Sequence, residues 1–234
     1  MISVCIAAYN GARYIREQIE SIVPQLGEND EIIVCDDHST DNTVDIVKHL
    51  PYPQIRLFEN AENLGYTGNF EHCLSLCRGE YIFLCDQDDV WFPNKVSVCL
   101  EALKQADFVV SDAIITDAAG HEIYPSFYAQ RGIHRSWFGN IVKFGFLGCL
   151  CAFKRSVRDK ALPFPKQRHL CTHDNWLFLV GKTFFKVKIL NQPLVRYRRH
   201  GDNASKGSVY AGTPLTFKIR YRLYLICQLL RRSL

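Results

Sequence analysis

Residues 81–91 read YIFLCDQDDVW, and this stretch decides the fold class. An apolar run over 81–85 is followed at once by acidic residues, the pattern of a buried strand that ends in a polar turn. Three more short apolar runs that end in polar turns lie upstream, at residues 2–8, 31–35 and 55–58. Repeated strand, loop and helix at this spacing predict an α/β fold, with a mostly parallel, open, doubly wound central sheet flanked by helices.

The segments between and after these strands complete the expected pattern. Residues 13–26 carry apolar side chains at helical spacing, and an Asn- and Gly-rich loop at 60–68 precedes another helix. Beyond Pro93 we expect a helix at 95–105, a strand at 108–111 and a second short strand at 114–116. An irregular aromatic loop at 125–140, a helix at 173–181 and at least one strand within 185–197 follow.

Length and charge limit the classes of protein. A chain of 234 residues with 47% hydrophobic and 22% charged residues suits one globular domain. A net charge of +4 is too small to indicate nucleic-acid binding. From Lys182 onward Asp202 is the only acidic residue, so we expect an anionic neighbour near this end of the chain.

The ten cysteines lie mostly in apolar runs, and none of them forms a C-x-x-C pair. They are therefore interpreted as reduced core thiols rather than disulfides or zinc ligands. No signal peptide or membrane-spanning run is recognisable, which predicts a cytoplasmic protein or one that lies on the inner face of the cytoplasmic membrane.

The acidic run after the strand at 81–85 predicts a metal site. Asp86, Asp88 and Asp89 repel one another unless a cation offsets their charge, and hard oxygen ligands suit Mg²⁺ or Mn²⁺. The alternative is a solvated acidic turn, but the bulky Trp91 and Phe92 follow directly and would shield the site. An EF-hand is excluded by the spacing, since the required glycine and glutamate are missing.

Two other strand ends carry candidate nucleoside contacts. Asp36 and Asp37 end the strand at 31–35, where one carboxylate can accept hydrogen bonds from a ribose or a base. A helix N-cap explains one of these acids but not both. Ala8, Tyr9 and Asn10 end the first strand, and Tyr9 offers a stacking face. Neither G-x-G-x-x-G nor a P-loop follows the first strand, which argues against a nicotinamide dehydrogenase and a P-loop triphosphatase.

The motifs occur in the order seen in family 2 glycosyltransferases. They are Tyr9-Asn10-Gly11, the run DDHSTDNT at 36–43, Asn63-Leu64-Gly65 with Asn69, and DQDDVW at 86–91. The chain resembles this family over roughly its first 200 residues, and the combination is far more specific than any single motif. The DQDD-x-W form is most similar to bacterial rhamnosyltransferase-like members that build surface polysaccharides.

The resemblance implies a GT-A fold and assigns roles to matching positions. Asp36 and residues Ala8, Tyr9 and Asn10 would hold the nucleoside, together with Asn69, Asp86 and Gln87. Asp86 and Asp88 would be the two acids of the DxD motif, with His200 as a further metal ligand or phosphate contact. Residues 196–205 resemble the late segment that folds over the donor diphosphate.

The acceptor side is implied by the segment THDNW at 172–176. Asp174 matches the catalytic carboxylate of the family, although His173 stands where an acidic residue is usual. Trp176 could form an apolar wall that raises the pKa of Asp174, whereas a plain N-cap explains Asp174 equally well. Trp176, His173 and Gly148 are assigned to the acceptor. Gly148 would let the backbone approach a sugar, and strand packing is the alternative.

These assignments predict a metal-dependent, inverting transfer of a sugar from a nucleotide-diphosphate donor. The acceptor would be a hydroxyl of a saccharide or lipid-linked saccharide. Alternatives are a sugar nucleotidyltransferase, which should carry a Gly-rich basic loop after the first strand, and a non-catalytic nucleotide-sugar-binding subunit, which should lack the acids.

The domain is expected to span residues 1–210, with a nucleotide-binding half at 1–111 and an acceptor-binding half at 112–210. Residues 211–234 are predicted to form a basic amphipathic helix. Its uncharged face carries Ile219, Leu223, Ile226, Cys227 and Leu230. The helix either lies on an anionic bilayer or packs on protein.

Overall fold

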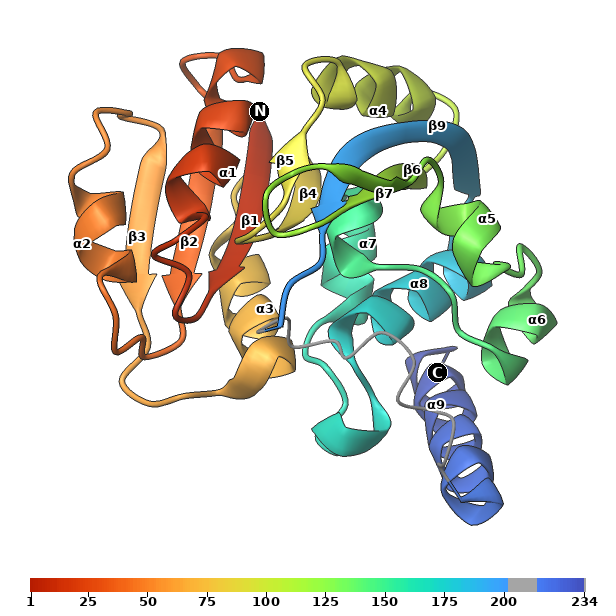
Figure 1. Ribbon diagram of the computed structural model, residues 1–234. Helices are drawn as coiled ribbons and strands as arrows, with labels where there is room; N and C mark the ends of the chain where they lie inside the picture. The colour runs from red at the N-terminus through yellow and green to blue at the C-terminus, as the bar shows by residue number, and fades with distance from the viewer. Residues whose placement is uncertain (202–213, 234) are drawn as a thin grey trace.

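The computed structural model describes residues 1–201 and 214–233. The first part of the chain alternates strands and helices as predicted. The strands are β1 (Ile2–Ala8), β2 (Glu31–Asp36), β3 (Ile55–Glu59) and β4 (Tyr81–Asp86), and the helices are α1 (Ile15–Ile22), the 3-10 turn η1 (Val23–Gln25), α2 (Thr43–Lys48) and α3 (Gly65–Leu76). These four strands pair in parallel in the order β3-β2-β1-β4, with α3 packed against β1 and β2 (Figure 1).

The rest of the chain adds shorter and more varied elements. The strands are β5 (Val90–Trp91), β6 (Phe108–Thr116), β7 (Glu122–Tyr124), β8 (Cys151–Lys154) and β9 (Val187–Arg198). The helices are α4 (Lys95–Leu103), α5 (Phe127–Arg131), α6 (Trp137–Val142), η2 (Gly148–Leu150), α7 (Arg155–Ala161), η3 (Arg168–Leu170), α8 (His173–Phe184) and α9 (Leu215–Ser233).

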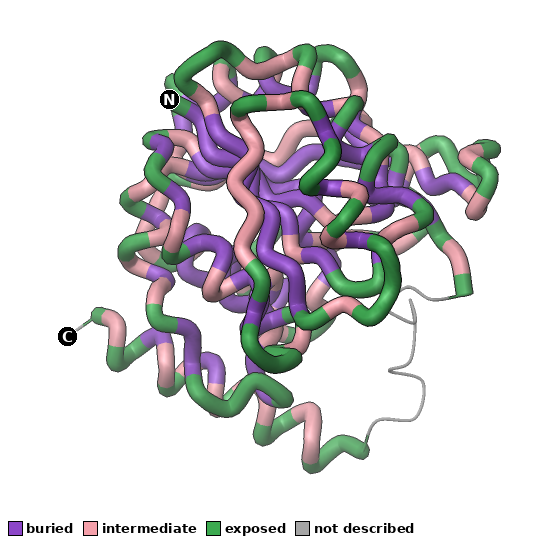
Figure 2. Tube along the Cα trace, turned by 90° about the vertical axis from the view of Figure 1, so that its left-hand side faces the viewer, coloured by how far each residue is buried: buried purple, intermediate pink, exposed green. Residues whose placement is uncertain are grey.

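All nine strands belong to one mixed sheet, in the order β3-β2-β1-β4-β8-β6-β9-β5, with β7 beside β6. The antiparallel strand β8 lies between β4 and β6, and β6 pairs in parallel with the much later β9. The predicted α/β fold with a GT-A type sheet is therefore confirmed; β1 to β4 form its run of four adjacent parallel strands, and β6 and β9 add one further parallel pair. The strands form the buried interior of the molecule, and the exposed segments lie around them (Figure 2).

Three local predictions need correction. The strands expected at 108–111 and 114–116 are one strand, β6, which absorbs two register shifts against β9. The loop expected to run to Gly68 ends at Leu64, because Gly65 adopts a positive φ of 71° and begins α3. The segment 125–140 contains α5 and α6, whose N-cap serines, Ser126 and Ser136, accept backbone hydrogen bonds.

The sheet register fixes where the site lies. Ala8 at the end of β1 stands opposite Asp36 of β2, and Ala7 stands opposite Asp86 of β4. The carboxyl ends of these three adjacent strands therefore meet at one edge, at the bottom in Figure 1. Strand β6 runs through residues 111 and 112, so the sheet is continuous across the expected boundary between the two halves.

Nine of the ten cysteines are buried and all ten are free thiols. Cys73, for example, donates to the carbonyl of Ile33 at 3.3 Å, where α3 crosses the sheet. The thiols thus serve as small core side chains, as their positions in apolar runs predict.

Candidate active site

The acid loop, residues 86–89 between β4 and β5, is attached to the end of β9. Asp89 is buried, and its Oδ1 accepts a hydrogen bond from the backbone N–H of Arg198 at 3.0 Å. The carboxylate of Asp88 contacts Nε2 of His200 at 2.8 Å. Two acids of the loop therefore hold a segment that lies more than a hundred positions later in the chain, and the predicted metal ligands Asp88 and His200 are brought together.

The carboxylates of the loop share one electrostatic environment. Burial, and then the charge of Asp88, raise the pKa of Asp86 to about 7, and Asp174 adds to this effect. Burial and the same neighbouring charge raise the pKa of Asp89 well above its ordinary value. Burial and mutual repulsion both disfavour the ionised forms of these carboxyls, and a bound cation would offset both effects.

A cluster that could hold a cation is present within the described residues. Ligand atoms of Asp86, Asp89 and Cys149 lie within 4.8 Å of one another. Oδ2 of Asp89 is buried and has no hydrogen-bond partner. Neither Asp89 nor Cys149 was predicted as a ligand. Asp89 belongs to the acidic run and could have been included, whereas nothing in the local sequence singles out Cys149, which reaches the cluster through the η2 turn.

The predicted nucleoside contacts lie on two loops, one after β1 and one after β2, which are joined by hydrogen bonds. Asp36 is buried and accepts hydrogen bonds from the backbone and side chain of Ser39, at 2.8 and 2.6 Å. Asn10 has a positive φ of 50°, and its side-chain oxygen accepts from the backbone N–H of Thr40 at 2.8 Å. The ring of Tyr9 remains 47% exposed. Of the predicted nucleoside contacts, Tyr9 thus presents the free stacking face.

Gln87 connects the loop after β1 to the acid loop. Its side-chain oxygen accepts from the N–H of Tyr9 and its amide donates to the carbonyl of Tyr9, both at 2.8 Å. A side chain at Gly11 would collide with Gln87, at 2.2 Å from its oxygen. The structure therefore gives Gln87 a positioning contact with the backbone of residue 9.

Two predicted nucleoside contacts lie beneath the surface. Asn69 is 1% exposed, and its amide donates to the carbonyls of Cys35 at 2.8 Å and Ala8 at 3.3 Å. Ala8 itself is fully buried, and its carbonyl also accepts from the N–H of Asp37. Asn69 and Ala8 hold the ends of β1 and β2 together, because α3 delivers the Asn69 amide to both strands.

Asp174 lies in the first turn of α8, on the side of the acid loop. Its Oδ1 accepts from the N–H of Asn175 at 2.8 Å and from the hydroxyl of Thr172. Asp174 lies beside Gly148, and the next residue, Cys149, lies beside Asp86, so Asp174 is near enough for its charge to contribute to the raised pKa of Asp86. Strand β4 and the much later helix α8 thus bring acids to the same region.

Gly148 and His173 lie next to Asp174. A Cβ on Gly148 would lie 2.5 Å from Nε2 of His173 and 3.6 Å from Cβ of Asp174. The His173 ring stacks on Phe70 with 4.1 Å between centroids, and burial lowers the pKa of His173. The absence of a side chain at Gly148 thus makes room for the imidazole of His173, and the predicted approach of a sugar to Gly148 stays a prediction.

Trp176 does not fit its predicted role. Its ring is fully buried, and its indole N–H donates to the carbonyl of Ala161 at 2.8 Å. A residue at this position of α8 points into the core beside α7, because it lies two positions along the helix from Asp174 and on another face. Trp176 is therefore a core residue, and this placement is incompatible with contact to an acceptor.

The basic segment predicted to fold over a diphosphate is described only as far as residue 201. Within it, Arg198 is buried, and its guanidinium pairs with Glu17 at 2.7 Å. Arg199 is exposed beside His200. Positions 202–205 of the prediction lie outside the described residues.

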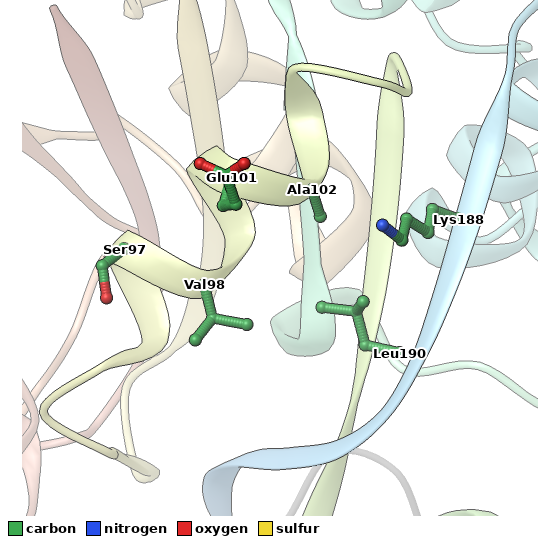
Figure 3. A pocket seen from close by; sticks show the side chains of 6 residues that line it. All are labelled: Ser97, Val98, Glu101, Ala102, Lys188 and Leu190. Atoms are coloured by element: carbon green, nitrogen blue, oxygen red, sulfur yellow. The ribbon is translucent and has the colours of Figure 1, made fainter.

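An open depression of about 350 Å³ lies between α4 and β9 (Figure 3). Its lining consists of Ser97, Val98, Glu101, Ala102, Lys188 and Leu190. None of the predicted site residues is among them, and the acids described above define the site better than this hollow does.

Comparison with known proteins identifies the class to which this fold and site belong. Residues 3–162 match the family described as Glycosyl transferase family 2. The chain belongs to this family, which confirms the assignment made from its motifs.

Curated relatives resemble most of the chain. A beta-1,3-glucosyltransferase of Escherichia coli, WfaP, which uses UDP-Glc and alpha-D-GlcNAc-diphosphoundecaprenol, is 29% identical over 88% of this chain and 80% of its own length. The dTDP-rhamnosyl transferase RfbG of Shigella flexneri is 26% identical over 93% of this chain and 77% of its own. An uncharacterized glycosyltransferase of Nostoc is 29% identical, and the match covers 86% of this chain but only 66% of the relative.

Solved structures agree on the fold. TarS of S. aureus in complex with UDP-GlcNAc superposes with a TM-score of 0.70 at 17% identity, covering 96% of this chain and 66% of TarS. The mannosyltransferase PcManGT of Pyrobaculum calidifontis, in complex with GDP-Man and Mn²⁺, gives 0.64 at 18% identity, covering 98% of this chain and 64% of PcManGT. The chain thus spans about two thirds of the length of these structures.

Proposed function

We propose that the protein transfers a sugar, with inversion, from a nucleotide-diphosphate donor to a hydroxyl of a saccharide or lipid-linked saccharide acceptor. The observation that carries this proposal is the convergence of Asp86, Asp88 and Asp174 at one edge of the sheet. Gln87 ties the same edge to an exposed tyrosine suited to stacking on a base. One bacterial relative transfers glucose from UDP-Glc to alpha-D-GlcNAc-diphosphoundecaprenol and another is a dTDP-rhamnosyl transferase, which supports a role in bacterial surface polysaccharide synthesis.

The residues present fit a divalent cation. Oδ2 of Asp89 is buried without a hydrogen-bond partner, and burial together with the charge of Asp88 raises the pKa of Asp86, so a bound cation would offset the charge of the loop. Asp86 and Asp88 would hold the cation, with His200 at the side of Asp88 and Asp89 within reach. When bound, Mn²⁺ or Mg²⁺ supplies positive charge that stabilises a leaving diphosphate. The Mn²⁺ and GDP-Man bound to PcManGT support this assignment.

The remaining steps fall to side chains of the chain itself. Tyr9 stacks on the base, and the loop of Asp36 orients the nucleoside. Asp174 accepts the proton of the acceptor hydroxyl while that oxygen attacks the anomeric carbon. The hydrogen bonds from Thr172 and Asn175 keep the Asp174 carboxylate oriented. His173, wedged between Phe70 and Gly148, fixes the start of α8 and lies at the acceptor side.

A single base and a direct displacement predict inversion at the anomeric carbon. Retention of configuration in the product would contradict the scheme, because retention by a covalent route needs a nucleophile on the opposite face.

The transfer is tested by incubating the protein with UDP-glucose, dTDP-rhamnose and GDP-mannose in turn, with Mn²⁺ or with EDTA. Release of nucleoside diphosphate should require the metal and one of the donors, and should be lost in Asp88→Ala. Release in EDTA at the same rate would exclude the metal site. Metal-dependent nucleotide binding without any release would favour a non-catalytic binding subunit, and release of pyrophosphate from a nucleoside triphosphate and a sugar phosphate would favour a nucleotidyltransferase.

We further propose that α9 places the protein on an anionic membrane surface. The inner face of α9 packs on the domain, where Leu225 and Leu229 are buried and Arg222 donates to the carbonyl of Ile141. The opposite face exposes Ile219, Leu223 and Leu230 at 50–61%. One face of α9 therefore packs on protein, and the other face remains available to contact a bilayer.

Nearby features favour lipid as the occupant of the open face. Phe138 and Val142 of α6 are 78% and 66% exposed, and α6 touches α9 through Arg222. Helix α9 carries five basic residues and no acidic one, which complements anionic headgroups. Among the described residues, no helix is both long and apolar enough to cross a bilayer, so contact would be peripheral.

Co-sedimentation with phosphatidylglycerol-containing vesicles tests the membrane contact, with neutral phosphatidylcholine vesicles as the comparison. The double variant Leu223→Ser, Leu230→Ser should lose about tenfold or more in vesicle affinity while its melting temperature stays unchanged. The lipid contact would be excluded if the variant bound vesicles as well as wild type does. It would also be excluded if wild type formed a concentration-dependent dimer that the variant does not form.

A further inference from the structure

Lys95, the first residue of α4, is a fully buried cation. Its ammonium donates to the carbonyl of Cys149 at 2.8 Å and lies 4.3 Å from the centre of the Trp91 ring. A buried ammonium is unfavourable unless nearby groups compensate its charge, so a function for it is expected.

The charge of Lys95 acts on the acid loop and on the cysteines around it. The ammonium lowers the pKa of Asp86, against the larger effects of burial and Asp88. Burial raises the pKa values of the Cys85 and Cys149 thiols well above their ordinary range, and Lys95 acts against that rise at both. A basic side chain therefore lies beside a group of acids that repel each other.

The carbonyl that Lys95 holds belongs to the η2 turn. In this turn Gly148 touches His173 and Asp174, and the thiol of Cys149 lies within 4.8 Å of carboxylate oxygens of Asp86 and Asp89. Lys95 thus contacts a segment that lies beside both the acid loop and the start of α8.

We propose that Lys95 is a positioning residue that serves as a resident counter-cation. Its ammonium keeps the acid loop and the η2 turn assembled before a divalent cation and nucleotide arrive. This inference rests on the proposed metal site of the acid loop. Because the lysine and the metal offset the same carboxylates, they compete electrostatically, and the lysine stabilises the metal-free protein at some cost in metal affinity.

Three variants separate charge from packing. Lys95→Met keeps the length and removes the charge, Lys95→Arg keeps the charge in a bulkier group, and Lys104→Met removes an exposed lysine at the end of the same helix. In EDTA, the melting temperature of Lys95→Met should fall by about 5–10 °C. The melting temperature of Lys95→Arg should fall less, although the larger guanidinium fits the buried position less well. If packing alone matters, Met will be tolerated better than Arg, and that order would overturn the proposal.

Titration with Mn²⁺ alone, followed by the melting temperature, provides the second readout. Lys95→Met should bind Mn²⁺ at a concentration about three- to tenfold lower than wild type does, and its stability should recover most of the loss. Lys104→Met should bind Mn²⁺ at the same concentration as wild type. An unchanged or higher Mn²⁺ midpoint in Lys95→Met would contradict the counter-cation role. A wild type that binds no Mn²⁺ would instead exclude the metal site of the proposed function, and the order of melting temperatures in EDTA would still decide the role of Lys95.

Discussion

The two halves of the sheet are built on different principles. In the N-terminal half, β1 to β4 alternate with helices, and all pairings among these four strands are parallel. Strand β1 pairs with β2, β2 pairs with β3, and β4 pairs with β1 on its other side. In the C-terminal half, β8 inserts antiparallel between β4 and β6, and β6 pairs with β9 about 80 residues later. The first half supplies the nucleoside loops and the acid loop, whereas the second supplies Asp174, Gly148 and His200.

Under the proposed function, the first half binds the nucleoside and supplies the acid loop, whereas the second half supplies the proposed base and His200. Substitutions in the two halves should therefore separate binding, stability and turnover. Four substitutions test that division.

Asp174→Asn should lower the rate of transfer about a thousandfold, because an amide cannot accept the proton of the acceptor hydroxyl. Nucleotide binding, measured by thermal shift with Mn²⁺, should stay within twofold of wild type. Asp159→Asn, an exposed acid on α7, is the matched control and should keep full turnover. Full activity of Asp174→Asn would place the base elsewhere and remove the proposed role of the second half.

Asn69→Ala should destabilise the protein by about 2–4 kcal/mol, because two buried carbonyls at the ends of β1 and β2 lose their donor. The free energy of unfolding in urea measures this effect. Gln192→Ala, at an exposed position of β9, should change it by less than about 0.5 kcal/mol. A stable Asn69→Ala protein with weakened nucleotide binding would instead support the direct contact predicted from the sequence.

Asp86→Asn should stabilise the metal-free protein near pH 8 by about 1–3 kcal/mol and abolish Mn²⁺ binding. The pKa of Asp86 rises from 3.8 to about 7 in the folded protein, so the folded state holds a proton that the unfolded state releases. The protein therefore loses stability as the pH rises from about 4 to 7, and the gain in the variant should be smaller at pH 5 than at pH 8. Equal gains at both pH values would mean that Asp86 does not carry this charge penalty.

Tyr9→Ala should weaken nucleotide binding about tenfold, since stacking of a base on an aromatic ring contributes ~1–3 kcal/mol. Its melting temperature should not change, because the ring is 47% exposed. Tyr124→Ala removes an equally exposed tyrosine from β7 and should leave binding unaffected. If both variants bind alike, Tyr9 does not touch the base.

The same contrast between halves explains what the sequence could predict. Strands and helices of the first half arise from local periodicity, and the acids at their ends follow from the rule for parallel sheets, so the fold and the acid loop were predictable. The meeting of Asp88 with His200 could be anticipated only from the family resemblance, because the two residues are 112 positions apart.

Other features had no local signal. Trp176 sits in a segment that resembles a catalytic motif, yet helix geometry turns its ring into the core. Cys149 and Lys95 look like an ordinary core thiol and a helix lysine in the sequence, and their place beside the acid loop depends on how β8 inserts into the sheet. Predictions failed where long-range pairing, and not periodicity, decides the neighbours of a side chain.

The paired hydrogen bonds between Gln87 and residue 9 carry an evolutionary consequence. The side chain of Gln87 pairs with residue 9 as a neighbouring strand would, because it bonds to the main-chain N–H and carbonyl and not to the side chain. A substitution at residue 9 is therefore expected to leave the loop that bears the carboxylates in place, so the proposed base contact is free to vary in evolution independently of the acids.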